Sequence, residues 1–170
     1  GMSPESLSRA LSQLRRIGVT GRGRTIVIAD PAMLDPITYS EIIAGRIMDK
    51  VYESLSANTA EGKIVPSLAT EWKANDNATV WRFSLRKGVK FHSGREFTAK
   101  DVKYTFEQLL TPGNKAGINS DYLVAVAGAK EMKDGQAKEL AGVKIIDPYT
   151  IEVNFATPEV LFPIYPIYLM

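Results

Sequence analysis

The sequence predicts an α/β fold in which helices pack outside a mixed β-sheet. Stretches that alternate apolar with polar residues, as strands do, are interspersed with stretches whose apolar residues recur at helical spacing. Clusters of Gly, Pro, Asn and Asp separate these stretches and indicate turns. The chain has 170 residues, of which 45% are hydrophobic and 24% charged, and this is the composition of one ordinary globular domain.

The first third of the chain is predicted to contain two helices and a strand. The first helix is expected to begin at Ser3, to carry a leucine-rich stripe from Leu7 to Ile17, and to end at Gly18. A basic Gly/Arg turn then leads into a β-branched strand over residues 25–29. A second helix is expected over residues 40–55, with Ser40 as its cap.

The middle of the chain is predicted to hold a strand pair. Residues 79–85 alternate strictly, and residues 89–91 resume the same period after a Lys-Gly turn. The side chains expected to point from the first strand into the core are Trp81, Phe83 and Leu85. Before this pair we expect a polar loop that turns back over residues 56–63, and then a short helical turn over residues 66–72.

Two further helices and a hairpin are predicted next. Thr98 and Asp101 have the spacing of a capping box, in which each side chain bonds the other residue's main chain. The apolar face of that helix is expected to comprise Val102, Tyr104, Thr105, Phe106, Leu109 and Leu110. A further helix should run from Ser120 or Asp121 to about Met132, with Leu123, Val124, Val126 and Ala127 facing inwards. Residues 144–155 read as a hairpin with Asp-Pro in its turn.

The last segment, residues 158–170, is almost wholly apolar. If it lay free, it would form a surface patch large enough to need covering. A homodimer or swapped dimer through this tail is one way to cover it.

Catalytic, metal and cofactor sites are not predicted. The chain has no cysteine, and its single histidine, His92, has neither a second histidine nor a thiolate with which to hold zinc. No catalytic triad or phosphate-binding loop can be assembled from the sequence, so we do not expect an enzyme. The net charge of +2 does not by itself attract nucleic acid or a membrane, no apolar run could span a bilayer, and the start lacks the apolar core of a secretory signal.

Three blocks of the sequence resemble a known family. The blocks are Pro66-Ser67-Leu68-Ala69-x-x-Trp72, Trp81-x-Phe83-x-Leu85-Arg86-Lys87-Gly88-Val89-x-Phe91-His92-x-Gly94 and Phe97-Thr98-Ala99-x-Asp101-Val102-x-x-Thr105-Phe106. They resemble the family 5 bacterial extracellular solute-binding proteins, the dipeptide-, oligopeptide- and nickel-binding components of ABC importers. Leu34-Asp35-Pro36 also resembles that family, in which a long helix follows this motif.

The resemblance implies a fold and a function. The fold would be a truncated lobe of a type II periplasmic-binding protein, so we expect the chain to be most of the first of two lobes. The protein would capture a peptide or related small solute by lobe closure and deliver it to an ABC transporter permease. It would act in the periplasm, or outside the cell on a lipid anchor. The implied lobe covers residues 25–170, leaving residues 1–24 as a separate helix and basic turn.

The resemblance also implies ligand-binding residues. Peptide binders of this family hold the ligand as an added strand, using main-chain bonds from the loop after Leu-Asp-Pro. The corresponding residues here are Thr38, Tyr39, Ser40 and Glu41. The alternative is that Ser40 only caps a helix and Tyr39 only packs. Because the second lobe would be missing, we expect weak or no peptide binding by this chain alone.

The N-terminal segment carries a smaller resemblance, to the recognition helix and wing of Crp/Fnr transcription regulators. By that resemblance Ser3, Glu5, Ser8 and Arg9 would face a DNA major groove. The first helix of the helix-turn-helix is absent, so we favour an amphipathic helix packed on the domain over a role in DNA binding. The two resemblances share the strand at Thr25, which can belong to only one of them in space.

Overall fold

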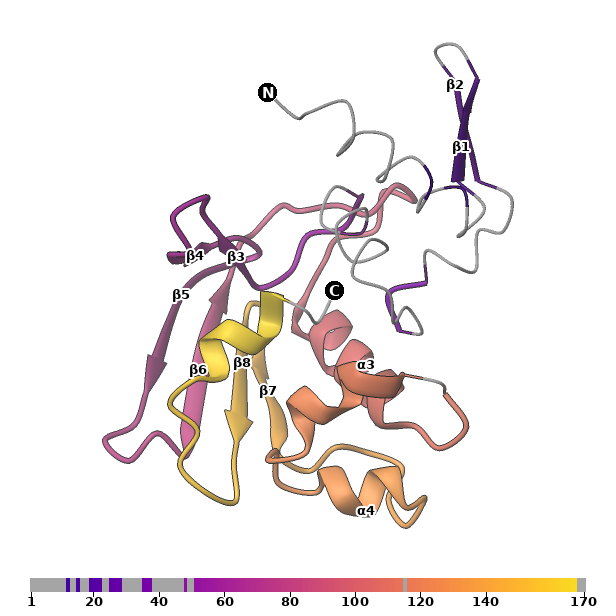
Figure 1. The fold of residues 1–170 in the computed structure, drawn as a ribbon. Coiled ribbons are helices and arrows are strands. Elements are labelled where there is room, and N and C mark those ends of the chain that lie inside the picture. The colour runs from indigo at the N-terminus through magenta and orange to yellow at the C-terminus, as the bar shows by residue number, and fades with distance from the viewer. Residues whose placement is uncertain are drawn as a thin grey trace.

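The computed structural model describes Ser12, Arg15 and residues 19–22, 25–28, 35–37, 48, 51–114 and 116–167. In this part of the chain the strands form one four-stranded sheet and two two-stranded sheets (Figure 1). Every strand pair described is antiparallel, so the predicted mixed sheet is wrong for these strands. The expectation of strands combined with packed helices is confirmed.

The main sheet brings together segments that are far apart in the sequence. Its strands are β5 (Ala69–Ala74), β6 (Val80–Leu85), β8 (Thr150–Asn154) and β7 (Val143–Asp147), in that spatial order. Phe83 of β6 lies opposite Trp72 of β5 and Ile151 of β8. Phe83 is fully buried, as its alternating position predicts, and the predicted C-terminal hairpin is confirmed as β7 and β8.

Two local predictions on either side of β6 are wrong. Residues 66–72 form no helical turn, because the chain there continues from β4 (Ile64–Pro66) into β5, whose main chain pairs with β6. The predicted return of residues 56–63 is confirmed, since β3 (Ser56–Asn58) pairs with β4. Residues 89–91 are not a strand. Gly88 and Gly94 adopt positive φ angles of 73° and 86°, and the turns they make leave a single bridge between Lys90 and Glu96.

Helix α3 (Ala99–Leu110) begins at the predicted capping box. The Asp101 carboxylate accepts hydrogen bonds from the Thr98 main-chain N–H at 2.8 Å and from the Thr98 hydroxyl at 3.2 Å. The same carboxylate pairs with Arg95 at 2.7 Å. Val102, Phe106, Leu109 and Leu110 are buried as predicted, whereas Tyr104 is 62% exposed and lies on the outer side of the helix.

The capping contacts predict a measurable loss of stability in Asp101→Ala. This variant leaves the Thr98 N–H without its carboxylate and removes a negative charge from a helix N-terminus. We expect a destabilisation of about 1–2 kcal/mol in urea unfolding. Lys100→Ala, at an exposed position in the same helical turn, should stay close to wild type. Equal stability of the two variants would contradict the capping role.

The predicted helix from Ser120 to Met132 is broken in the structure. A 3₁₀ helix, η2 (Gly117–Leu123), is followed by irregular chain and then by the short helix α4 (Ala129–Lys133). Leu123 and Val126 are buried as expected, but Val124 is 56% exposed. Val126 instead bridges to Phe155, and Gly128 turns the chain with a φ of 84°. The pairing with distant Phe155 therefore replaces helical hydrogen bonds here.

The apolar C-terminal segment packs onto the sheet over its described residues. It forms the 3₁₀ helix η3 (Phe162–Ile167), which lies in front of β6 and β8 in Figure 1. Phe162 is fully buried, and the Trp81 indole N–H donates to the Glu159 carbonyl at 2.8 Å. The Ser56 hydroxyl donates to the Pro163 carbonyl at 2.8 Å. The described part of this segment therefore does not lie free, although Val160 and Leu161 remain exposed.

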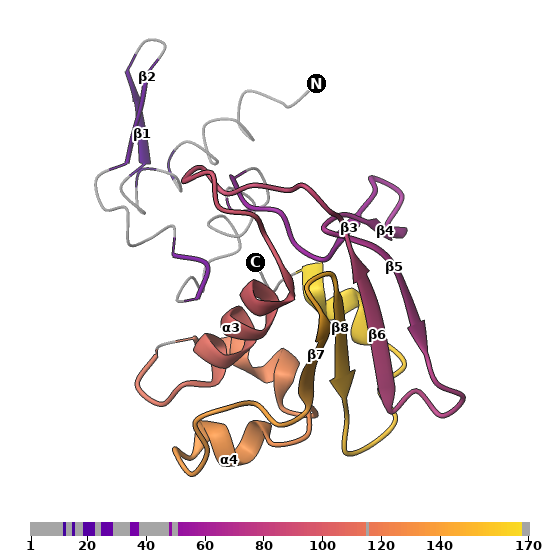
Figure 2. The same cartoon turned by 180° about the vertical axis from the view of Figure 1, so that it is seen from behind.

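The first hairpin stands apart from the main sheet. Strand β1 (Val19–Arg22) pairs only with β2 (Thr25–Ile28) among the described strands, with Arg22 opposite Thr25. The hairpin projects from the rest of the described chain in both views (Figures 1 and 2). The strand that both resemblances share is thus paired within an N-terminal hairpin. This pairing crosses the predicted boundary between residues 24 and 25, which stays a prediction.

Both N-terminal helices fall mostly outside the described residues. Ser12 and Arg15 are helical, in line with the first predicted helix. Met48 and Val51 are helical, but residues 52–55 are not, so the second helix ends earlier than predicted. The Tyr52 N–H still donates to the Met48 carbonyl at 2.8 Å, as the last bond of that helix.

Candidate functional site

The residues predicted to bind ligand or DNA lie outside the described part of the chain. This applies to Thr38, Tyr39, Ser40 and Glu41, and to Ser3, Glu5, Ser8 and Arg9. The segment just before the first group is described. The Asp35 carboxylate accepts the Ile37 N–H at 2.9 Å, and Ile37 packs against the core. Asp35 and Pro36 of the motif therefore lie in a turn at the edge of the core, immediately before the predicted ligand-binding residues in the sequence.

The described residues form a pocket of about 430 Å³ beside the first turns of α3. Its walls come from residues 51–55, the loop at residues 89–92 and α3, together with Leu68 and Phe97. The lining side chains that are buried are Leu55, Leu68, Phe97, Val102 and Phe106. Tyr52, Phe91 and His92 line it from exposed positions. The sequence blocks that carry the family resemblance thus converge on one apolar cavity, which periodicity alone does not predict.

A hydrogen-bonded turn holds the loop that forms one wall of this pocket. The Glu96 carboxylate accepts the Gly88 N–H at 3.0 Å and the Tyr149 hydroxyl at 2.7 Å. These two bonds hold the pKa of Glu96 below its ordinary value, with the tyrosine bond as the larger cause. The same bond raises the pKa of Tyr149. Sequence reasoning missed both residues, because they lie on different elements and only the fold brings them together.

The Glu96–Tyr149 bond predicts a pH effect. A carboxyl group whose pKa is depressed by folding stabilises the folded state above its unfolded pKa, and that stabilisation is lost as pH falls through the folded pKa. Tyr149→Phe should raise the pKa of Glu96 towards its ordinary value. The stability of this variant should therefore fall less than that of wild type as the pH is lowered. Carboxyl NMR titration and melting curves across acid pH measure the two effects. Tyr104→Phe, which alters an exposed ring, serves as the control, and an unchanged Glu96 pKa in Tyr149→Phe would contradict the assignment.

The acidic residues that line the pocket form ion pairs, whereas its lysine does not within the described residues. Asp101 pairs with Arg95 at 2.7 Å, and Glu53 pairs with Arg86 at 2.9 Å. Lys90 also lines the pocket and takes part in no ion pair within the described residues, although the Glu96 carboxylate attracts it at longer range. The acids are therefore neutralised by neighbouring arginines, whereas the lysine leaves the pocket rim positively charged.

The described residues hold neither a metal-binding cluster nor a helix that could span a membrane. That part of the chain contains no cluster of three or more His, Asp and Glu side chains able to hold a metal ion. His92 is exposed on the pocket rim. No helix within the same residues is both long enough and apolar enough to cross a bilayer.

Comparison with known proteins identifies relatives over most of the chain. The periplasmic murein peptide-binding protein MppA of Escherichia coli is 32% identical over 133 residues, covering 76% of this chain and 24% of that protein. The periplasmic oligopeptide-binding protein OppA of Escherichia coli is 33% identical over 129 residues, covering 74% and 23%. The crystal structure of Haemophilus influenzae OppA in complex with the peptide RPPGFSPFR matches with a TM-score of 0.70 and 28% identity, covering 76% of this chain and 26% of that one. The chain thus spans about a quarter of the length of the relatives it matches.

The family assignment rests on the same blocks that form the main sheet, the pocket and α3. Residues 63–169 match the family described as "Bacterial extracellular solute-binding proteins, family 5 Middle". This is a family of substrate-binding proteins and not of enzymes. Because the match covers more than half of the chain, the chain belongs to the family 5 bacterial extracellular solute-binding proteins.

Proposed function

We propose that this chain is part of the peptide-binding component of an ABC importer. The observation that carries the proposal is the match of residues 63–169 to the family, together with the peptide-binding names of its relatives. Its partners would be a peptide or a related small solute and the transporter permease. It would act in the periplasm or on a lipid anchor at the cell surface. The described fold would be most of one lobe of a two-lobed binding protein.

The ligand contacts belong to the same proposal. Thr38, Tyr39, Ser40 and Glu41 would offer main-chain and side-chain bonds to the backbone of an extended peptide. The support for this is the turn at residues 35–37, which is bonded internally and held at the core. A loop that leaves a rigid turn is well placed to present its polar groups to a ligand.

A chimera with the Escherichia coli oligopeptide-binding protein tests this function. Residues 35–167 of this chain would replace the homologous quarter of that protein. We expect the folded chimera to bind peptides in calorimetry, while the 170-residue chain alone binds them weakly or not at all. Ser40→Ala and Glu41→Gln should then weaken binding by the chimera, whereas the exposed change Lys138→Gln should not. A chimera that folds but binds no peptide would count against the function, and micromolar binding by the chain alone would contradict the need for a second lobe.

A second function is favoured by the isolated N-terminal hairpin. Residues 1–28 contain five arginines and one acid, Glu5, whereas the whole chain has a net charge of only +2. Arg15 is exposed on its helix, and the β1–β2 hairpin projects from the rest of the described chain. We propose as the alternative that this segment is a DNA-binding remnant, in which Ser3, Glu5, Ser8 and Arg9 would face the duplex.

Salt-dependent duplex binding separates the two functions. A DNA-binding segment should retard a duplex at low salt, and retardation should weaken steeply as salt rises because counterions are released on binding. Arg15→Gln should reduce the retardation, and Lys138→Gln, in the other part of the chain, should not. The absence of retardation at low salt would eliminate the alternative.

A further inference from the structure

The pocket beside α3 has the features of a binding site for a small organic molecule. Its volume of about 430 Å³ falls in the range usual for ligand pockets, roughly 300–1,000 Å³. We propose that it binds a small ligand with an apolar body and a single carboxylate. This site is additional to the peptide-contacting loop proposed above, and neither proposal depends on the other.

The floor of the pocket determines the apolar body of the ligand. Leu55, Leu68, Phe97, Val102 and Phe106 line it and are each at most 9% exposed. They come from three separate parts of the chain, so the cavity wall is held by the core itself. An apolar ring system placed there moves from water to a surface of aliphatic and aromatic carbon. This burial of apolar surface is the main driving force for binding in such pockets.

The rim holds two aromatic rings that remain accessible. Tyr52 is 40% exposed and Phe91 is 42% exposed, and both line the cavity. The Phe91 ring is positioned by edge contact with Phe97, at 6.2 Å between centroids, and by the Arg95 guanidinium at 4.4 Å from its centroid. Phe91 is therefore a positioned wall for a flat ligand.

The charged residues around the pocket indicate that the ligand carries a negative charge. The two acids that line the pocket, Asp101 and Glu53, already pair with arginines. Lys90 lines the same pocket without an ion pair in the described residues, apart from the longer-range attraction of Glu96. His92, also on the rim, adds a ring N–H that can donate a hydrogen bond. A carboxylate would gain a cation here, whereas a ligand amine would meet only acids that are already neutralised.

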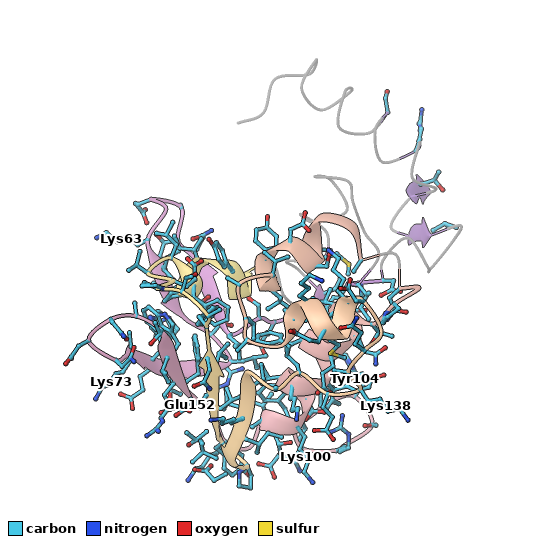
Figure 3. The ribbon with its side chains drawn as sticks, turned by 90° about the horizontal axis from the view of Figure 1, so that it is seen from below. Lys63, Lys73, Lys100, Tyr104, Lys138 and Glu152 are labelled. Carbon is cyan, nitrogen blue, oxygen red and sulfur yellow. The ribbon has the colours of Figure 1, made fainter. Side chains whose placement is uncertain are left out.

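Calorimetry with a matched pair of ligands tests the proposal on the 170-residue chain. The probes are 1-naphthaleneacetate and the neutral 1-naphthaleneacetamide, which share one apolar body. We expect saturable binding of the acid, and binding of the amide that is weaker by about two- to fivefold, the range set by one exposed ion pair. Lys90→Gln should remove that difference, and Lys100→Gln, with its lysine on the outer side of α3, should preserve it (Figure 3).

Variants of the aromatic rim test the location. Phe91→Ala and Tyr52→Ala each remove an exposed wall and should weaken both probes by about fivefold or more, while circular dichroism confirms that each variant is folded. Tyr104→Ala, which removes a 62% exposed ring outside the pocket, should leave binding unchanged. The proposal would be overturned by the absence of saturable acid binding, by equal affinity for acid and amide, or by unchanged binding in both rim variants. Peptide binding by the chimera does not enter any of these outcomes.

Discussion

Phe162→Ala is expected to destabilise the protein by about 3–5 kcal/mol, the largest effect of any substitution considered. The Phe162 ring is fully buried and packs against four other rings. Their centroids lie at 4.7 Å (Phe155), 5.8 Å (Phe83), 6.2 Å (Tyr165) and 6.5 Å (Phe106) from its own. Phe106 belongs to α3 and Phe83 to the main sheet, so the Phe162 ring connects η3 to both the helix and the sheet. Its removal would leave a cavity between these four rings.

The matched control for this variant is the preceding residue. Leu161→Ala also shortens an apolar side chain in the same segment, but Leu161 is 52% exposed. We expect its stability in urea unfolding to lie within about 0.5 kcal/mol of wild type. A double-mutant cycle with Phe155→Ala should give a coupling of about 0.5–1.5 kcal/mol for the ring pair. If Phe162→Ala cost less than about 1 kcal/mol, the C-terminal segment would not be part of the core.

Sequence reasoning succeeded where structure is determined by residues close together in the chain. The capping box needs only Thr98 and Asp101, and both are in place. The alternation of β6 and the Asp-Pro turn of the β7–β8 hairpin are likewise local, and the structure confirms them. The family resemblance also rests on local blocks, and the comparisons confirm it.

Sequence reasoning failed where a distant partner decides the local structure. A helical turn is predicted over residues 66–72, but residues 69–72 join a sheet because β6 supplies their hydrogen-bond partners. The segment after Leu123 leaves its helix because Val126 pairs with Phe155. The pocket could not be predicted either, since its floor is assembled from segments that periodicity treats separately. Of the four rings around Phe162, Phe83, Phe106 and Phe155 lie outside η3, and an apolar tail alone does not reveal them.

Gly142→Ala is expected to produce the second large loss of stability, for a reason that composition and periodicity do not show. Gly142 lies where three segments of the chain meet. Its N–H donates to the Ala127 carbonyl at 2.7 Å, and its carbonyl accepts the Asn154 N–H at 2.7 Å. The Asn154 side-chain amide donates to the same carbonyl at 3.1 Å. These bonds join the start of β7, the end of β8 and the chain that enters α4.

A side chain at position 142 has no room in this arrangement. An added Cβ atom would lie 2.6 Å from the Ala127 oxygen, 2.8 Å from the Asn154 oxygen and 2.8 Å from a Val126 methyl carbon. Two of these neighbours are main-chain oxygens that accept hydrogen bonds from Gly142 and Ala127, so they cannot move away without breaking those bonds. We expect Gly142→Ala to cost about 2–4 kcal/mol in urea unfolding, from steric strain and weakened hydrogen bonds together.

Gly21→Ala separates this steric effect from a general cost of replacing glycine. An added Cβ atom at Gly21 meets no atom within 4 Å, so alanine in β1 should leave stability near that of wild type or raise it slightly. Amide hydrogen exchange provides the second measurement. In Gly142→Ala the main-chain amides at positions 142, 127 and 154 should lose protection first, because each donates a hydrogen bond to another of these three residues. Equal stability of the two glycine variants would show that the chain around Gly142, Ala127 and Asn154 can move apart at little cost. The hydrogen bonds among these residues would then not hold β7, β8 and α4 together.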